Sequence, residues 1–178
     1  KLDTVIDGVL VSDQMFAFIQ QQLDLGDLET ATWFLGSSSN YIAEADPDQT
    51  VTVSLDGVLA ENDSVSVRIG TAAITTTSND YLSPQQSIAN AVDGYNGPGT
   101  LVYSLETGEL TYAGGQGGTS MGNLVIAAQP VDDSSFEYTE ALSISLTNPG
   151  SNTGNRVNIS EVASAVTLNN LDDDGTAR

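Results

Sequence analysis

The chain has no cysteine and no histidine, and only four of its 178 residues are Lys or Arg. These absences exclude structural zinc, haem, thiol catalysis and a Ser-His-Asp arrangement within this chain. No apolar run is long enough to span a membrane, and no signal peptide is recognisable. The fold must form without disulfides, and a bound metal ion could supply a similar restraint outside the cell.

Acidic residues dominate the charge: 24 Asp and Glu give a net charge of −20. Because no basic face is available to neutralise phosphates, nucleic acid is excluded as a partner. The same charge argues against binding to anionic membranes and against membrane insertion. A solvated acidic surface explains a single Asp as well as calcium binding does, but it explains clustered carboxylates less well.

Two clusters of carboxylates flank predicted strands. The first precedes a strand at 141–146 and the second follows a strand at 162–168; they contain Asp132, Asp133, Glu137 and Glu140, and Asp172, Asp173 and Asp174. Carboxylates gathered in this way repel one another unless a cation relieves them. Calcium takes about six to eight oxygen ligands in loose geometry, so the two clusters predict one shared calcium site.

Val, Ile and Thr dominate a series of short segments that Asp, Asn, Gly and Pro separate, as in β-strands joined by turns. The predicted strands are 50–55, 64–69, 100–105, 109–112, 124–129, 141–146 and 162–168. Trp33 begins a further strand and is expected in the core, with an exposed ligand-stacking Trp as the alternative. Asn148-Pro149-Gly150 predicts a turn. This pattern is typical of an all-β, antiparallel sandwich.

Residues 1–32 are predicted to be an extension packed on, or leading into, a single domain at 33–178. Its first eleven residues form a linker strand, and a short helix capped by Ser12 or Asp13 is favoured over a second strand. Segments 82–99 and 113–122 are expected to be long loops, which in compact domains are usually functional or disordered.

Several segments, in chain order, resemble the Calx-β family. They are Tyr41-Ile42-Ala43-Glu44 before a strand, Asn79-Asp80-Tyr81 at a strand end, Pro130 to Asp133 with Glu137 and Glu140, a strand ending in Asn148-Pro149, and 165–168 leading to Asp172-Asp173-Asp174. The resemblance implies a Greek-key β-sandwich with calcium at one end. It matches the family's ligand positions to Glu44, Asp80, Asp132, Asp133, Glu137, Glu140, Asp172, Asp173 and Asp174. Glu44 as a solvated residue and Asp80 as a turn former stay open as alternatives.

Family repeats are usually shorter, and the extra length here lies in 1–32, 82–99 and 106–122. In size, acidity and β pattern the chain resembles the peptide-binding domain of large RTX-type bacterial surface adhesins. That resemblance implies a secreted module, flanked by other adhesin domains on the cell surface. It would bind short peptides or protein C-termini with several calcium ions, in adhesion and biofilm formation.

The segment AGGQGGTSMG at 113–122 nearly fits an RTX calcium repeat, but Thr119 replaces the binding Asp and only one copy exists. A phosphate loop would need a following Lys-Ser/Thr and a helix. A flexible loop remains, either a carboxylate-binding nest or a plain hairpin tip. The 93–99 loop suits a calcium ion that also touches ligand, with Tyr95 and Tyr112 as candidate apolar walls. The predicted ligand-binding residues are Asp93 (also a metal ligand), Tyr95, Asn96, Gly114, Gly115, Gln116, Gly117, Gly118, Thr119 and Ser120.

Three other classes remain as alternatives: a calcium-rigidified structural extender, a glycan-binding module and a glycoside hydrolase. A hydrolase would need paired carboxylates with one in an apolar pocket, and nothing in the sequence places one there. We therefore expect no enzymatic activity.

Overall fold

The computed structural model describes residues 4–6, 9–11, 30–43, 49–76, 81–132, 138–154 and 156–171. Within the N-terminal extension, β1 (Thr4–Ile6) and β2 (Val9–Val11) pair antiparallel in a sheet of their own. This hairpin replaces the single linker strand expected over the first eleven residues. The helix predicted after Ser12 lies outside the described residues.

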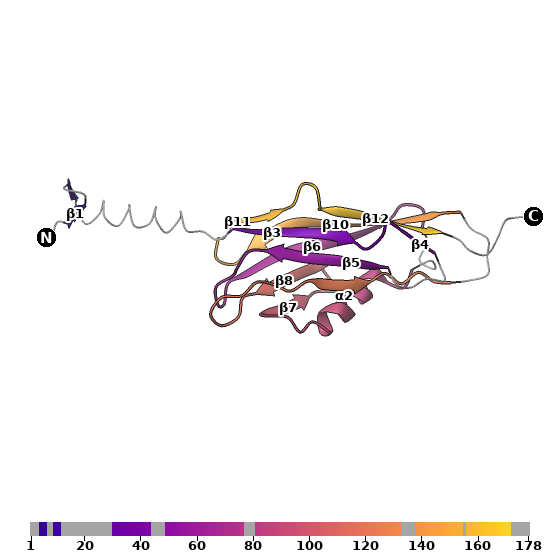
Figure 1. Ribbon diagram of the computed structural model, residues 1–178, viewed down its shortest axis with the longest axis horizontal. Coiled ribbons are helices and arrows are strands. Elements are labelled where there is room, and N and C mark those ends of the chain that lie inside the picture. Colours follow the sequence, from indigo (N-terminus) through magenta and orange to yellow (C-terminus); the bar gives the residue numbers. More distant parts are fainter. Residues whose placement is uncertain are drawn as a thin grey trace, which may run out of the picture.

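Ten strands form the sandwich in the described parts of the chain (Figure 1). They are β3 (Thr30–Ser37), β4 (Tyr41–Ala43), β5 (Thr50–Asp56), β6 (Ser64–Ala73), β7 (Thr100–Tyr103), β8 (Glu109–Ala113), β9 (Leu124–Ala127), β10 (Glu140–Ser151), β11 (Arg156–Ile159) and β12 (Ala165–Leu171). One sheet has the order β4-β12-β10-β6-β8-β7, and the other has the order β11-β3-β5-β9. The predicted all-β, mainly antiparallel sandwich is thus confirmed.

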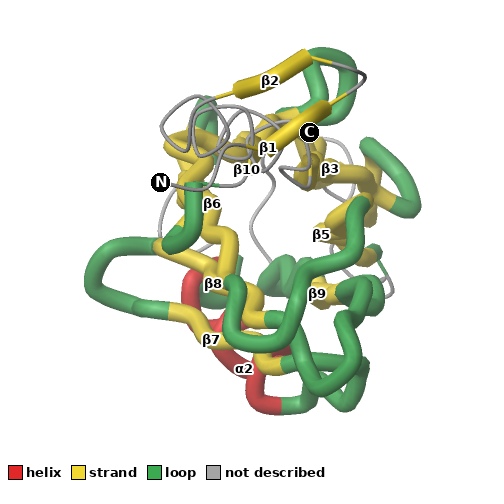
Figure 2. The backbone as a smooth tube through the Cα atoms, turned by 90° about the vertical axis from the view of Figure 1, so that its left-hand side faces the viewer, coloured by secondary structure: helices red, strands yellow, loops and turns green. Residues whose placement is uncertain are grey.

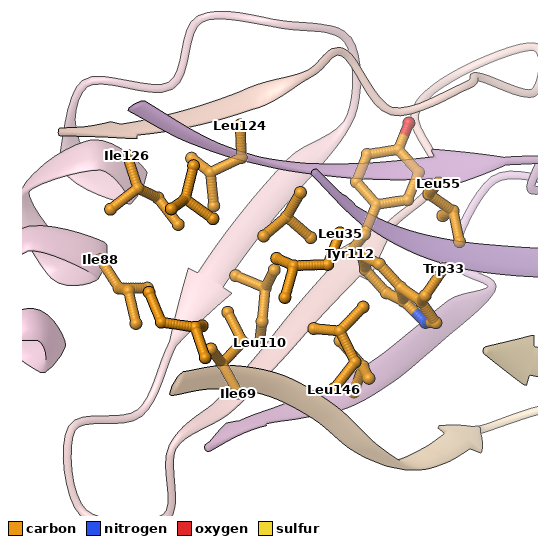
Figure 3. Packing of buried hydrophobic residues seen from close by; sticks show 14 of the residues in the cluster. Trp33, Leu35, Leu55, Ile69, Ile88, Leu110, Tyr112, Leu124, Ile126 and Leu146 are labelled. Atoms are coloured by element: carbon orange, nitrogen blue, oxygen red, sulfur yellow. The ribbon is translucent and has the colours of Figure 1, made fainter. Parts of the chain in front are cut away.

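Alternating side chains give each sheet one buried face, because successive residues of a strand point to opposite sides. In β5, Val51, Val53 and Leu55 are buried, while Thr52 and Ser54 between them lie on the outer side. Trp33 of β3 is fully buried and packs in the same core, as expected (Figure 3). The strand centres therefore lie where the alternation predicted them.

Two of the chain segments that pass from one sheet to the other run side by side. β3 belongs to the four-stranded sheet, and β4, which follows it, belongs to the six-stranded sheet; β11 and β12 make the same transfer beside them. The β11–β3 and β12–β4 pairs are parallel, and the N–H of Leu35 donates to the carbonyl of Ala163 between them. This paired crossing ties the two sheets together along one side of the sandwich.

A helix stands where a long loop was expected. α2 (Pro84–Asp93) begins at Ser83, whose Oγ accepts from the N–H of Gln86, and Pro84 occupies the first turn. Ile88 is buried between the sheets, so α2 closes the side of the sandwich between β7 and β9 (Figure 2). In the parts of the chain that the structure describes, no helix is long and apolar enough to cross a membrane.

The turn predicted at Asn148-Pro149-Gly150 is also wrong, because β10 continues through these residues to Ser151. The pairing of β10 with β6 shifts between Thr147 and Gly150, and Asn148 adopts φ 51°. This is a β-bulge, in which extra residues are accommodated in a strand without ending it. Proline is tolerated at such a position because it need not donate to the ladder.

Candidate calcium-binding end and ligand pocket

Several strand ends meet at one end of the sandwich. The last residue of β4, Ala43, pairs with Leu171, the last residue of β12. On the other side of β12, Asn170 pairs with Glu140, the first residue of β10. Tyr81 forms a bridge with Pro130 after the end of β9. Strand register therefore brings the ends of β4 and β12 and the start of β10 together, and Tyr81 lines one cavity with Leu142 of β10.

The predicted calcium ligands are neighbours of these strand ends in the sequence. Glu44 comes directly after β4, Asp172 directly after β12, and Asp80 directly before Tyr81. Two of the predicted ligands at this end are described: Asp132, which is exposed, and Glu140, which is half-buried. The others lie outside the described residues: Glu44, Asp80, Asp133, Glu137, Asp172, Asp173 and Asp174.

The donor types at this end fit calcium better than a transition metal. Carboxylates and backbone carbonyls are the ligands that calcium prefers, and the chain has no Cys or His for a softer ion. Within the described residues, no three acidic side chains come close enough to hold an ion. The case for calcium at this end therefore rests on the backbone pairing of the strand ends and on the carboxylates that adjoin these strand ends in the sequence.

Asp93 is placed elsewhere. It is the last residue of α2 and is exposed. The helix separates it from Pro84, near the Tyr81–Pro130 bridge, by roughly 14 Å at about 1.5 Å per residue. Asp93 therefore belongs to a second location and cannot share an ion with the strand-end carboxylates.

The two segments expected to be long loops do come together. Residues 94–97, after α2, face residues 122–125, before and within β9, across a cavity of about 260 Å³. Of the predicted ligand-binding residues, Tyr95 and Asn96 line this cavity. Sequence reasoning missed Gly122, Asn123, Leu124 and Val125, since only the packing of α2 against β9 shows that they lie beside the helix end.

Tyr95 fastens the two walls of the cavity to each other. The N–H of Gly122 donates to Tyr95 Oη over 2.9 Å, and the same hydroxyl donates to the carbonyl of Pro98 over 3.0 Å. A Cβ on Gly97 would collide with the Tyr95 ring, so glycine is needed for this close approach. The cavity is therefore a formed feature with hydrogen-bonded walls.

Replacing Tyr95 by Phe should loosen these walls while keeping the ring. We expect a loss of about 1 kcal/mol in the free energy of unfolding, because one buried N–H loses its acceptor. Amide exchange at Gly122 should accelerate, as measured by NMR. Tyr41→Phe is the matched control, since Tyr41 is 62% exposed. Equal exchange at Gly122 in both variants would contradict the clamp.

The Gly-rich segment is held in a defined conformation. Gly114 N–H donates to the carbonyl of Asp63, and Gly115 N–H donates to Thr119 Oγ1. Gly118 N–H donates to the carbonyl of Gly115, and Thr119 N–H to that of Leu59. These four N–H groups are used within the protein, so they are not available for the carboxylate-binding nest, one of the two alternatives that the sequence left open. Around the exposed tip lie Gln116, Gly117 and Ser120.

Tyr112 anchors this segment from below. Its hydroxyl lies 2.7 Å from Thr119 Oγ1, and its side chain is fully buried. Burial raises the pKa of Tyr112, the hydrogen bond to Thr119 lowers it, and the nearby Tyr95 raises it further. Tyr112 is therefore a core residue and not a wall of the cavity, whereas Tyr95 is a wall.

No protein-family model and no curated protein sequence matches this chain. Among solved structures, the apo form of the Calx CBD1 domain is similar, with a TM-score of 0.48 and 18% identity over 81% of this chain and 98% of that one. The calcium binding domain CBD12 of CALX1.1 gives 0.45 and 18% over 81% of this chain, and CBD12 from CALX1.2 gives 0.43 and 20% over 79%. The match spans 44% of each of these two longer chains.

Proposed function

We propose that this domain is a calcium-dependent ligand-binding module of a bacterial surface adhesin, and that it binds short peptides or protein C-termini. The observation that carries the proposal is the meeting of the ends of β4 and β12, the start of β10 and the Tyr81–Pro130 bridge. Each of these positions is followed or preceded in the sequence by the carboxylates of the calcium prediction.

Calcium at this end would act first on stability. With a net charge of −20, folding brings like charges together, and an ion removes the repulsion among those that it binds. The ligands would come from Glu44, Asp80, Asp132, Asp133, Glu137, Glu140, Asp172, Asp173 and Asp174. Because these carboxylates outnumber what one ion can hold, several ions are proposed.

The 260 Å³ cavity is the proposed peptide site. Its lining carries the amides of Asn96 and Asn123, the ring of Tyr95 and exposed glycine backbone, and no charged side chain. Amides and bare backbone are suited to a peptide main chain. A free C-terminal carboxylate would be repelled by Asp93 and by the negative end of α2, unless a cation bound there. A calcium ion on Asp93 with an open coordination position would reverse that repulsion.

The peptide proposal is tested with two immobilised pools of pentapeptides whose last three residues are randomised, one with free and one with amidated C-termini. In calcium, we expect capture of the protein by the free pool alone, with a Kd of roughly 1–100 µM, since a few residues bury little area. Asn96→Ala should weaken capture, and Asn90→Ala, on the exposed side of α2, should not. Equal capture by both pools would overturn the carboxylate proposal.

A structural extender is the second candidate, and one observation favours it. β3 begins beside β11 at one end of the sandwich, whereas β12 finishes beside β4 at the opposite end (Figure 1). Domains joined through these ends would stand in series, with calcium at the junction. Stabilisation by calcium without capture by either peptide pool, or by a glycan array, would favour this function.

A further inference from the structure

The edge of β6 that faces β8 is paired over only half its length. β8 pairs with Ser64 to Arg68, and the N–H of Ile69 donates to the carbonyl of Gly108 in the turn before β8. β6 continues for four more residues to Ala73. In the described part of the chain, no further strand lies along this edge.

The direction of the backbone groups follows from the neighbouring bonds. In an antiparallel ladder, the N–H and C=O of alternate residues point to opposite edges. Ile69 points toward β8 and Ile74 donates to Ala141 beside β10, so Thr71 and Ala73 point away from β10. Among the described residues, no hydrogen bond reaches the backbone groups of Thr71 or Ala73 on that side. Within the part of the chain that the structure describes, two N–H and two C=O groups thus form an unpaired strand edge.

Two cavities lie along this edge, and both are lined by Thr71 and Gln85. The larger, about 410 Å³, has an apolar floor of Ala73, Tyr81, Pro84 and Leu142, with hydroxyl groups at its rim and no charged side chain among the described lining residues. The smaller, about 210 Å³, includes Arg68 and Glu106. Gln85 Nε2 donates to Thr71 Oγ1 over 2.7 Å, which holds the start of α2 beside the edge through the side chain only.

We propose that this edge binds an extended, uncharged peptide strand, antiparallel to β6 and in line with β8. Backbone hydrogen bonds to Thr71 and Ala73 would supply the affinity, as in β-strand addition. The peptide residue opposite Ala73 would place its side chain in the larger cavity. Because that cavity has an apolar floor and no charge, the side chain is aliphatic. This site is separate from the 94–97 cavity.

A peptide fits this edge better than the other possible occupants. Thr71 and Ala73 present the same donor and acceptor pair at a two-residue repeat of about 6.8 Å, which only another extended main chain matches. A second copy of this chain would bring another net charge of −20 against the first. Repulsion of this size opposes association of two copies at low salt.

The probe is the acetylated and amidated pentapeptide Thr-Val-Thr-Val-Thr, with two N-methylated twins. When its valines point into the larger cavity, their N–H groups face β6, whereas the N–H of the central threonine faces solvent. We expect the parent and the twin methylated at the central threonine to shift and protect the Thr71 and Ala73 amides, with a Kd of about 1 mM. The peptide methylated at both valines should neither shift nor protect the Thr71 and Ala73 amides, because it lacks the N–H groups that face β6. Equal binding by the two twins would overturn the proposal.

Ala73→Pro tests the same edge from the protein side. It removes one free N–H that makes no ladder bond, so the fold should survive, as judged by its melting temperature and by unshifted amide signals at Gly70 and Ala72. We expect the variant to lose probe binding at least tenfold. Probe binding equal to that of the original protein would refute the proposal. Self-association in sedimentation that Ala73→Pro abolishes would identify a second copy as the occupant, and would also refute it.

Discussion

Chelation of calcium with EGTA is expected to lower the melting temperature by about 10–20 °C. Two ions, each present at about 100 times its Kd, stabilise the folded state by about 5 kcal/mol in total. For a domain of this size, each kcal/mol corresponds to about 2–4 °C. The ions would act at the ends of β4 and β12. These two strands pair with each other directly after the chain has passed from the four-stranded sheet to the six-stranded sheet.

The melting curve should be recorded in calcium, in magnesium, and in sodium chloride of matched ionic strength. Magnesium should restore little of the melting temperature lost in EGTA, because it demands tighter octahedral geometry. The sodium chloride sample measures the effect of general charge screening, so that it can be told apart from specific calcium binding. Asp132→Asn combined with Asp133→Asn should reproduce part of the chelation effect. Asp56→Asn combined with Glu61→Gln, which removes two carboxylates from the β5–β6 region, is the matched control. A melting temperature unchanged by EGTA would remove calcium from the proposed function.

The strands that sequence predicted best are those with one buried and one outer face. In β5, β6 and β8, hydrophobic residues alternate with Ser, Thr or charged residues, and this period has no helical equivalent. The ends of these strands were less accurate. β6 extends four residues beyond the predicted 64–69 segment, and its free edge is therefore a property that the pattern did not reveal.

The helix was missed because half of its residues are polar and its apolar residues are mostly small, so the sequence shows no strong apolar stripe. Between Pro84 and Asp93, only Ile88 reaches the centre of the core. The start signal was present in Ser83-Pro84, a capping residue followed by proline at the first helical position. Asn148-Pro149-Gly150 misled in the opposite direction, because turn residues also suit a bulge inside a long strand.

The candidate site, too, has features that the sequence shows and features that only the tertiary structure shows. The carboxylates are visible in the sequence, but whether they share one location depends on strand register, which local patterns do not give. The glycines at 114–118 suggested flexibility, yet the N–H groups of Gly114, Gly115 and Gly118 are bonded to Asp63, Thr119 and Gly115. The kind of chemistry therefore stays a prediction from composition, whereas tertiary pairing decides which residues lie close enough together to take part in it.

Ile88→Ala is expected to destabilise the domain by about 3 kcal/mol, or about 6–12 °C in melting temperature. Ile88 is 1% exposed and points from α2 into the space between Ile126 and Ile69 (Figure 3). A small apolar void of about 20 Å³ already borders it, so the side chains around it have little means of closing the larger cavity. A segment that were merely a surface loop would lose almost nothing on the same change.

Ile88→Val and Asn90→Ala complete the series. The valine variant keeps most of the packing and should cost about 1 kcal/mol. Asn90 lies on the exposed side of α2, where its side chain bonds to Gln86, and its replacement should cost less than about 0.5 kcal/mol. Since α2 carries Tyr95 at one end and Gln85 at the other, Ile88→Ala should also speed amide exchange at Gly122. Equal urea midpoints for the three variants would show that α2 contributes nothing to the core and that neither proposed binding site is supported by it.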